Sequence, residues 1–409
     1  MTKIELFTAA LELPHPWYIE RIELKPAGAG QELHLHLAHH KGAKFWYEAE
    51  GVAGADHGVY DHQRRTWQHL HFFQHVCFIH AGVPRVRTAG GKVRLVDIPW
   101  AQRGSGFTLL FEDRVIELIR DGMAKTGAAR QMGTTDKRIA GVIKRRVCTA
   151  LAAQPLAPVR EPGVDETSRR RGHNYLTVLT DRGAKRWWAC LGKDGEAVAH
   201  ALLDMEIRGA GRGAVRCVTT DLSPAYIKAS KELFPGADLV FDRFHLMQLF
   251  ARAIDAVRRR EQRRGAKDLV NTRYDWLRNA DRLSDKRAER LRGLMLAYPD
   301  LGTIYQYRQT FKTLLDAAHE DHRVGPLKTW IKLARTSGIA ELEKLAASYE
   351  RHWYGIKTYF KRLATNAFAE RVNLTIQQIK RTAKGYRNMQ NFIHVIYLHL
   401  GGLKLLSTE

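Results

Sequence analysis

The sequence predicts an α/β protein in which a mixed β-sheet is interrupted by an all-helical insertion and preceded by a small β-rich domain and a pair of helices. Three observations predict this class. Residues 163–245 read as three strands followed by alternating helices and strands, in the order βββαβαβ. Residues 246–365 have helical periodicity and many arginines. Residues 1–105 alternate apolar and polar side chains in short runs between turns.

The composition limits the class of protein further. The chain has 409 residues, of which 44% are hydrophobic, so it is long enough for several domains with buried cores. No apolar run approaches the roughly 18 residues of a membrane-spanning helix, and the N-terminus lacks the features of a signal peptide. Its four cysteines form no CxxC pair, which argues against a zinc site or disulfide framework. We expect a soluble, cytoplasmic protein with no membrane partner.

The charge indicates the partner. Lysine and arginine number 66 and aspartate and glutamate 43, a net charge of +23. So many positive side chains repel one another unless a polyanion neutralises them. Nucleic acid is such a polyanion, and contacts of Lys and Arg with its phosphates favour binding because counterions are released. We therefore expect a DNA-binding protein that associates with the nucleoid when bound.

Residues 1–105 are expected to form hairpins, because RIELKPAGAGQELHLHLAHH at 21–40 alternates on either side of a glycine-containing turn. Histidines are dense here and suggest two alternatives, a metal cluster or ordinary packed and solvated strand positions. The second is favoured because the histidines stand among aromatics at strand spacing and have no cysteine partners. They are His57, His62, His69, His71, His75 and His80.

Residues 106–151 predict a helix-turn-helix. A short helix ends at Gly133, Thr134 or Thr135 can cap the next helix, and that helix buries one apolar stripe. Its apolar positions are Ile139, Val142, Ile143 and Val147, and its outer positions are Lys137, Arg138, Lys144 and Arg145. The alternative is an ordinary helical pair with a solvated basic face; the net charge favours DNA binding.

Residues 152–162 hold three prolines and are expected to form a stiff linker. In residues 163–245 the order βββαβαβ is that of ribonuclease H-like folds, in which the first and fourth strands are adjacent. Asp165 in the first strand and Asp221 after the fourth would then lie side by side. Adjacent carboxylates repel unless they share a cation, and hard oxygen ligands suit Mg²⁺ or Mn²⁺. The alternative for Asp221 is a helix cap or turn residue.

Residues 366–400 are expected to form one long helix and an apolar tail. The part of this helix around Glu370 has an apolar stripe and an opposite polar face that carries Glu370. A polar face with one acid among amides and basic groups suits a metal site beside a DNA backbone. From spacing alone, however, a solvent-facing glutamate is the default reading. The other members of the polar face are Asn373, Gln377, Arg381 and Lys384.

Three long stretches resemble a known family. GVDETSRRRGHNYLTVLTD, the stretch from VTTDLSPAY through DLVFDRFH to IDAVRR, and TNAFAERVNLTIQQIKRTAKGYRNMQNF are similar, in order and spacing, to bacterial insertion-sequence transposases of the third-numbered ISL family. The N-terminal stretches YDHQRRTWQHL, VPRVR, VDIPWA and FTLLFED resemble it too. The resemblance covers nearly the whole chain.

The resemblance implies a DDE transposase with a ribonuclease H-like core at 163–245 and 366–409, interrupted by the helical insertion at 246–365. Its metal-binding catalytic triad would be Asp165, Asp221 and Glu370, with two Mg²⁺ or Mn²⁺ ions. The Asp-x-x-His of Asp242 and His245 resembles a motif of related transposases. It either supports the site or is a structural strand-to-helix junction. Asn373 is a further candidate for support.

One departure concerns zinc. The family usually carries a cysteine-rich zinc ribbon near the N-terminus, but the corresponding places here read YEAEG at 47–51 and RTAGGK at 87–92. We expect a degenerate ribbon-like domain at 1–105 that binds no zinc.

The predicted function is metal-dependent nicking at the ends of an insertion sequence, followed by transfer of the 3′-hydroxyl into target DNA. The partners would be double-stranded DNA with terminal inverted repeats, target DNA, and a second copy or more of the chain. Two alternatives are a nuclease of the same fold without strand transfer and an inactive or domesticated transposase that only binds DNA. The residues expected to contact DNA are Lys137, Arg138, Lys144, Arg145, Arg258, Arg259, Arg260, Lys380, Arg381, Lys384 and Arg387.

Overall fold

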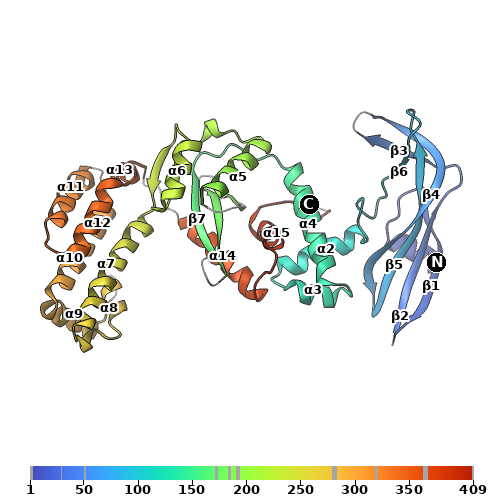
Figure 1. Ribbon diagram of the computed structural model, residues 1–409. Helices are drawn as coiled ribbons and strands as arrows, with labels where there is room; N and C mark the ends of the chain where they lie inside the picture. Colours follow the sequence, from blue (N-terminus) through green and yellow to red (C-terminus); the bar gives the residue numbers. More distant parts are fainter. Residues whose placement is uncertain are drawn as a thin grey trace. The chain divides into compact units, whose positions relative to one another are not determined.

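The chain folds into two compact units, each of which is described by itself. Unit 1 contains Met1–Ala153 and Arg381–Glu409, and unit 2 contains Gln154–Lys380 (Figure 1). The computed structural model describes residues 3–28, 30–49, 52–170, 174–182, 186–189, 194–278, 283–317, 321–362 and 367–407.

Unit 1 begins with helix α1 (Lys3–Ala10) and a six-stranded sheet in the order β1-β2-β5-β4-β3, with β6 paired to β5. The hairpin predicted at 21–40 is confirmed, because β1 and β2 pair antiparallel. β4 and β5 form a second, longer hairpin. The strands are β1 (Trp17–Ala27), β2 (Gly30–His39), β3 (Lys44–Ala49), β4 (Val52–Phe72), β5 (His75–Arg87) and β6 (Val93–Leu95).

The core of this sheet is aromatic. Trp17, Trp67 and Trp100 are buried and pack edge to face. Several histidines bond to one another across neighbouring strands: His34 Nδ1 lies 2.8 Å from His80 Nε2, and His39 Nε2 lies 2.8 Å from a nitrogen of His62. These histidines therefore take part in strand packing.

The cysteines described are free thiols. Cys77 and Cys217 are buried and Cys148 is exposed, whereas Cys190 lies outside the described residues. Of the two stretches at which the sequence departs from the ribbon that the resemblance implies, 87–92 forms a turn in which Thr88 N–H donates to the Lys92 carbonyl. Glu50 and Gly51, at the end of the other stretch, lie outside the described part of the chain.

Three helices follow the sheet: α2 (Leu109–Arg120), α3 (Lys125–Gln131) and α4 (Asp136–Ala153). The helix-turn-helix outline is confirmed. Thr135 Oγ1 accepts the Arg138 N–H and caps α4. The apolar stripe predicted for α4 is buried as expected: Ile139, Val142, Ile143 and Val147.

Helix α15 (Met389–Leu400) packs against α4 and α2, so the end of the chain belongs to unit 1. The apolar face of α15 packs against α4 and α2, and Phe392 and Ile396 on this helix are fully buried. The tail is fastened as well, since the Ser407 N–H donates to Asp113 Oδ1. The prediction of one long helix over residues 366–400 is wrong, because helices at Ala367–Thr382 and Met389–Leu400 are separated by a turn in which Lys384 and Gly385 have positive φ. The predicted segment 366–409 is also divided between the two units near residue 380.

Unit 2 contains the second sheet, in the order β11-β10-β7-β8-β9. The predicted order βββαβαβ is confirmed, and so is the adjacency of its first and fourth strands, because β10 pairs with β7 in parallel. The strands are β7 (Pro162–Arg170), β8 (Asn174–Asp181), β9 (Arg186–Ala189), β10 (Cys217–Thr220) and β11 (Asp238–Phe241). Helices α5 (Asp194–Ile207) and α6 (Pro224–Leu233) connect them.

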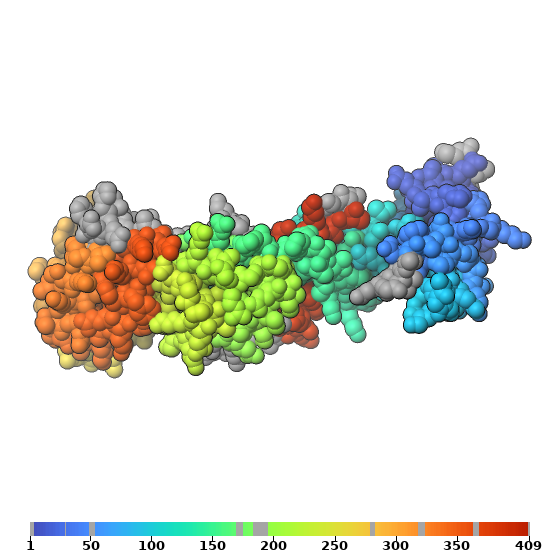
Figure 2. Space-filling model, turned by 90° about the horizontal axis from the view of Figure 1, so that it is seen from above, coloured from blue at the N-terminus to red at the C-terminus, as the bar shows by residue number. Residues whose placement is uncertain are grey.

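The predicted helical insertion is confirmed in the described residues between β11 and α14 (Ala367–Thr382). Helix α13 returns to the sheet and packs against β11, and Figure 2 shows the orange surface of the insertion adjoining the yellow-green surface of the α6–β11 region. Its helices are α7 (Arg243–Arg263), α8 (Arg273–Leu277), α9 (Asp285–Ala297), α10 (Pro299–Asp316), α11 (Asp321–Arg335), α12 (Ala340–Arg351) and α13 (Trp353–Arg362). No helix among the described residues could cross a membrane.

Candidate active site

Three acidic residues lie at neighbouring positions in the register of three adjacent parallel strands, within β7 and directly after β10 and β11. Thr219 of β10 is paired with Gly163 of β7, so Asp221 and Asp165 each stand two residues beyond a paired position. Thr220 is likewise paired with Phe241 of β11, and Asp242 follows directly. Since neighbouring strands are about 4.8 Å apart, this register brings the three acids to one edge of the sheet.

Asp165 is held by groups from three elements. Its Oδ1 accepts the N–H of Glu166 at 2.8 Å, and its Oδ2 accepts Nδ2 of Asn373 from α14 at 2.8 Å. His245, in the first turn of α7, places Nε2 3.8 Å from Asp165 Oδ1. Burial alone would lower the pKa of His245, but Asp165, Asp221 and Asp242 together raise it above its usual value.

Asp221 follows β10 and precedes the N-cap of α6, Ser223. Its Oδ1 accepts the Ser223 N–H at 2.9 Å, which is the turn role expected as the alternative. Burial raises the pKa of the Asp221 carboxyl and the charge of Asp165 adds to this, against the opposing effect of the Ser223 N–H and His245. Among the described residues no lysine or arginine forms an ion pair with Asp221, so its charge lacks the usual partner.

Glu370 lies in the first turn of α14 and is exposed. Burial raises the pKa of Glu370, and the negative charges of Asp242 and Asp165 raise it further. Glu370 is therefore close enough to these two acids to interact with them electrostatically. Asp242 is 3% exposed and is the N-cap residue of α7. The structure thus brings all six predicted site residues to one region of unit 2, and Asp242 also occupies the predicted strand-to-helix junction.

The two helices beside β7 contact opposite faces of the sheet. Side chains alternate along a strand, so Asp165 and Thr167 share one face and Glu166 points to the other. On the first face, Gln377 of α14 donates to Thr167 Oγ1 at 2.8 Å. On the other, the buried Tyr226 of α6 donates to Glu166 Oε1 at 2.9 Å. Helix α14, drawn beside β7 in Figure 1, is therefore fixed on the face that carries Asp165.

Tyr226, Glu166 and Arg252 are site residues that the sequence analysis missed. Tyr226 also bonds Thr177 of β8 at 2.8 Å, so it connects the helix after Asp221 to two strands. Arg252 of α7 is exposed, and its charge lowers the pKa of Asp221 without forming an ion pair. The alternation along GVDET could have shown that Glu166 faces away from Asp165, but no local pattern identifies its partner.

The donor set suits a hard divalent cation. As they stand, no three His, Cys, Asp or Glu side chains in the described part of the chain lie close enough together to hold a metal ion. Asn373 Oδ1, however, is buried and has no hydrogen-bond partner there, although Nδ2 of the same amide is bonded to Asp165. A buried amide oxygen beside Asp165, whose charge helps to raise the pKa of Asp221 and Glu370, is the kind of oxygen environment that Mg²⁺ and Mn²⁺ accept.

Two arginines of the insertion are placed differently from the prediction. Arg258 is 8% exposed and bonds Asp255, Gln262 and the Leu269 carbonyl, and Arg260 bonds Glu341 and Asp300. The guanidinium of Arg258 is enclosed by acceptors of its own helix and the Leu269 carbonyl, and that of Arg260 is held by acids of α10 and α12. Arg259 is 64% exposed beside Asp255.

Lys380, the last residue of unit 2, donates to the Ser168 carbonyl at 2.7 Å and so fastens α14 to β7. The remaining predicted DNA contacts at the start of the C-terminal segment, Arg381, Lys384 and Arg387, are exposed.

In the helix-turn-helix, Lys137 and Lys144 are exposed as predicted. Arg138 has its guanidinium 4.2 Å from the Phe107 ring centre and donates to Gln68 Oε1. Arg145 was predicted to face outward, but it is half-buried and bonds Glu112 Oε1 through Nε at 3.1 Å. The buried carboxylate of Glu112 attracts this side chain inward, together with Arg146.

Comparison with known proteins defines the class. Residues 96–147 match the family described as "Helix-turn-helix domain of transposase family ISL3", and residues 163–396 match its DDE family, described as "Transposase". The chain is a transposase with a helix-turn-helix DNA-binding domain. Enzymes of the DDE class transfer phosphoryl groups and typically use divalent metal ions.

The relatives agree with this class. The transposase of insertion sequence element IS1557 from Mycobacterium tuberculosis is 25% identical over 98% of this chain and 96% of its own length. The transposase of element IS1001 from Bordetella parapertussis is 31% identical over 58% of this chain and 62% of its own. The family match covers more than half of the chain, and the protein belongs to the ISL3 family of insertion-sequence transposases.

Proposed function

We propose that the protein nicks DNA at the ends of its insertion sequence and transfers the freed 3′-hydroxyl into target DNA, using a ribonuclease H-like core. The observation that carries this proposal is the row of Asp165, Asp221 and Asp242 at one edge of a mixed sheet, with Glu370 on the adjoining helix. The sheet order, with the first strand between an antiparallel and a parallel neighbour, supports this core.

We propose Asp165, Asp221 and Glu370 as the residues that hold two Mg²⁺ or Mn²⁺ ions, with the Asn373 amide oxygen as a further donor. Bound divalent ions would activate a water for attack and stabilise the leaving 3′-oxygen. Zinc is not proposed, because the ribbon cysteines are absent from the chain.

The other residues prepare the site. Asn373 and His245 fix the orientation of the Asp165 carboxylate from two sides. Arg252 adds positive charge beside Asp221, where a DNA phosphate would lie. Lys137 and Lys144 on α4 would bind the terminal inverted repeat, and Arg259 would hold phosphate backbone. Because two ends must be joined, we propose that a dimer or larger assembly acts inside the bacterial cell.

The experiment uses the full chain, Mg²⁺ and a duplex that carries the inverted repeat of its own element. Nicked ends and joined products are measured separately on wild type, Asp165→Asn and Asp221→Asn. Wild type is expected to form both products. The rate of nicking by each variant should fall at least about a thousandfold, since a metal ligand contributes several kcal/mol to the stabilisation of the transition state. Asp238→Asn, which alters a carboxylate paired with Arg362 outside the site, is the matched control and should retain activity.

The outcomes separate the alternatives. Nicking without joining would identify a nuclease of this fold. Binding to the inverted repeat with no more nicking than Asp221→Asn would identify a DNA-binding protein without catalysis. Either result contradicts the proposed strand transfer.

A further inference from the structure

The tip of the β4–β5 hairpin in unit 1 exposes two neighbouring phenylalanines. Phe73 is 81% exposed and Phe72 39% exposed, and their ring centres are 4.6 Å apart. The turn joins Phe72 to His75, which are paired across the hairpin. Phe73 contacts Phe72, but most of its side chain is open to water, so this surface is available to a partner.

The backbone at this tip is unusual for the residue it holds. Phe73 has φ +52°, in the left-handed region that a bulky side chain rarely adopts and that glycine occupies readily. Asparagine and glycine are the usual residues of such hairpin turns. A bulky aromatic residue in this strained conformation motivates the hypothesis that its ring has a function.

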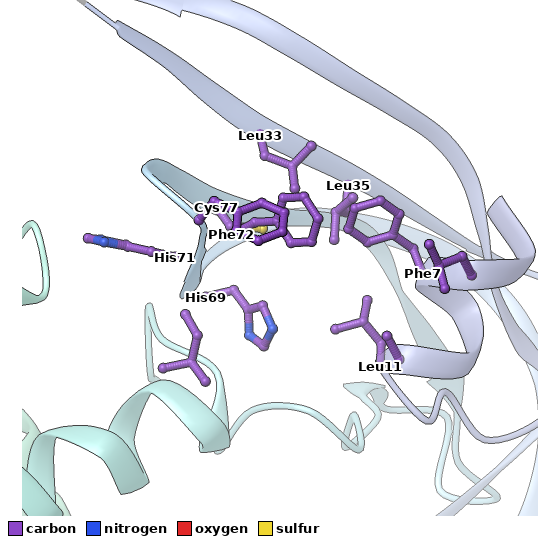
Figure 3. A pocket seen from close by; sticks show the side chains of 12 residues that line it. Phe7, Leu11, Leu33, Leu35, His69, His71, Phe72 and Cys77 are labelled. Carbon is purple, nitrogen blue, oxygen red and sulfur yellow. The ribbon is translucent and has the colours of Figure 1, made fainter. Parts of the chain in front are cut away.

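The first ring anchors the second. An apolar cavity of about 360 Å³ lies behind the tip, lined by α1 and the sheet (Figure 3). The Phe72 ring lies over this cavity, 4.9 Å from the Phe7 ring of α1. In Figure 3, His69 points into the cavity whereas His71 points away from it. Phe73 also lines this cavity and packs against Phe72, while most of its side chain remains exposed.

The hairpin is fastened to the turn of the helix-turn-helix. Gln68, which is 2% exposed, donates Nε2 to the carbonyls of Met132 and Gly133 at 3.0 and 3.2 Å. Arg138 of α4 donates to the Oε1 of the same side chain. A Cβ placed on Gly133 would lie 3.0 Å from His71 Nε2, so the last residues of β4 lie directly against that turn.

This placement determines what the tip can meet. In helix-turn-helix proteins the start of the second helix enters the major groove, and the turn before it lies at the DNA surface. Gly133 precedes α4 by three residues, so the hairpin tip is adjacent to the DNA that α4 contacts. Arg130 and Lys137 flank the turn, are exposed, and form no ion pair among the described residues.

We propose that the β4–β5 tip is a DNA-contacting wing, in which the Phe73 ring packs against sugars and base edges of the groove beside the one that α4 occupies. Apolar side chains are used in this way by proteins that contact the minor groove. The positive charge around the turn favours a polyanion over a protein partner. This inference rests on the proposed binding of the inverted repeat by the helix-turn-helix.

The test replaces Phe73 in the full chain and measures binding to the inverted-repeat duplex by fluorescence anisotropy, the contacted bases by hydroxyl-radical footprinting, and stability by thermal unfolding. Phe73→Gly removes the ring and relieves the backbone, so the variant should be at least as stable as wild type. Its affinity should fall roughly tenfold, the loss typical of one aromatic contact to nucleic acid, and the footprint should shorten at one end. Phe73→Trp should bind within roughly threefold of wild type because it keeps an aromatic face.

Trp46→Ala is the matched control. Trp46 is an aromatic of the same sheet, 60% exposed, and pairs with Asp56, about 50 Å along β4 from the tip at about 3.3 Å per residue. It should bind DNA like wild type.

Unchanged affinity and an unchanged footprint for Phe73→Gly would overturn the proposal that the β4–β5 tip contacts DNA. A change only in the sedimentation of the DNA-free protein would overturn it too and identify the tip as a contact between copies of the chain. If wild type does not bind the duplex, the proposed binding of the inverted repeat by the helix-turn-helix is wrong. The proposed DNA contact of the hairpin tip is then wrong as well.

Discussion

Two buried carboxylates of unit 1 are paired with arginines, whereas Asp221 in the site of unit 2 forms no ion pair with a lysine or arginine of the described residues. Glu112 in α2 is fully buried, with Arg146 Nε at 2.9 Å and Arg145 beside it, and Asp113 pairs with Arg146 at 2.6 Å. Asp221 is also partly buried, yet its only hydrogen bond among the described residues comes from a backbone N–H. In a chain with 66 lysines and arginines, such an absence is informative.

The difference teaches how to separate structural from functional carboxylates in a basic protein. A buried carboxylate with an arginine partner contributes to the fold and has no capacity left for a ligand. When ionised carboxylates lie close together, the charge of each raises the pKa of the other. A shared cation offsets this repulsion and stabilises the ionised form of both. The comparison therefore predicts opposite responses when an acid is neutralised in each region.

The largest change in stability is expected at Glu112. Glu112→Gln leaves the buried Arg146 without its full counter-charge, and breaking a buried pair typically destabilises a protein by about 3–5 kcal/mol. Thermal unfolding measures the loss. Glu117→Gln, which removes an exposed pair with Arg114, should change stability by no more than about 0.5 kcal/mol. Equal effects of the two variants would show that burial of the pair is unimportant.

Asn373→Ala should lower nicking by about 10- to 100-fold, the usual effect of removing a group that orients a metal ligand. Because Asn373 orients Asp165, the variant should also need more Mg²⁺ for half-maximal activity. Gln378→Ala, an exposed change on the same helix, is the control. A loss that is the same at every Mg²⁺ concentration would contradict a role in metal binding.

A smaller effect of opposite sign is expected at Asp221. In metal-free buffer, Asp221→Asn removes a partly buried charge that is repelled by Asp165, so the free energy of unfolding should rise by about 1 kcal/mol. The same substitution is expected to abolish nicking. Destabilisation by Asp221→Asn without metal would indicate that the carboxylate serves the fold, as Glu112 does.

Much of this arrangement was predictable because it is encoded locally. Period-two alternation predicted the first hairpin, and a cap and an apolar stripe predicted α4. The end of a strand singled out Asp221, and the expected adjacency of the first and fourth strands placed Asp165 beside it. The helical stripe of α14 placed Asn373 and Glu370 on its polar face. The assignment of Glu370 to the site, however, depended on resemblance to a family, since one glutamate on a helix carries no signal of its own.

The rest depends on contacts between residues far apart in sequence. Nothing near Arg260 in the chain shows that Glu341 and Asp300 bond its guanidinium, so its helix reads as a basic surface. Likewise, Tyr226 meets Glu166, and Gln68 meets Gly133, only when the fold is complete. A count of basic residues therefore overstates the surface available to DNA.

Direct binding of Mn²⁺ tests the central claim most closely, namely that Asp165, Asp221 and Glu370 share divalent cations. Electron paramagnetic resonance would measure Mn²⁺ bound to the full chain with its inverted-repeat duplex, for wild type and Asp221→Asn. Wild type should bind Mn²⁺ that Mg²⁺ displaces, and the variant should bind at least roughly tenfold more weakly. Equal Mn²⁺ binding by the two proteins would contradict the account.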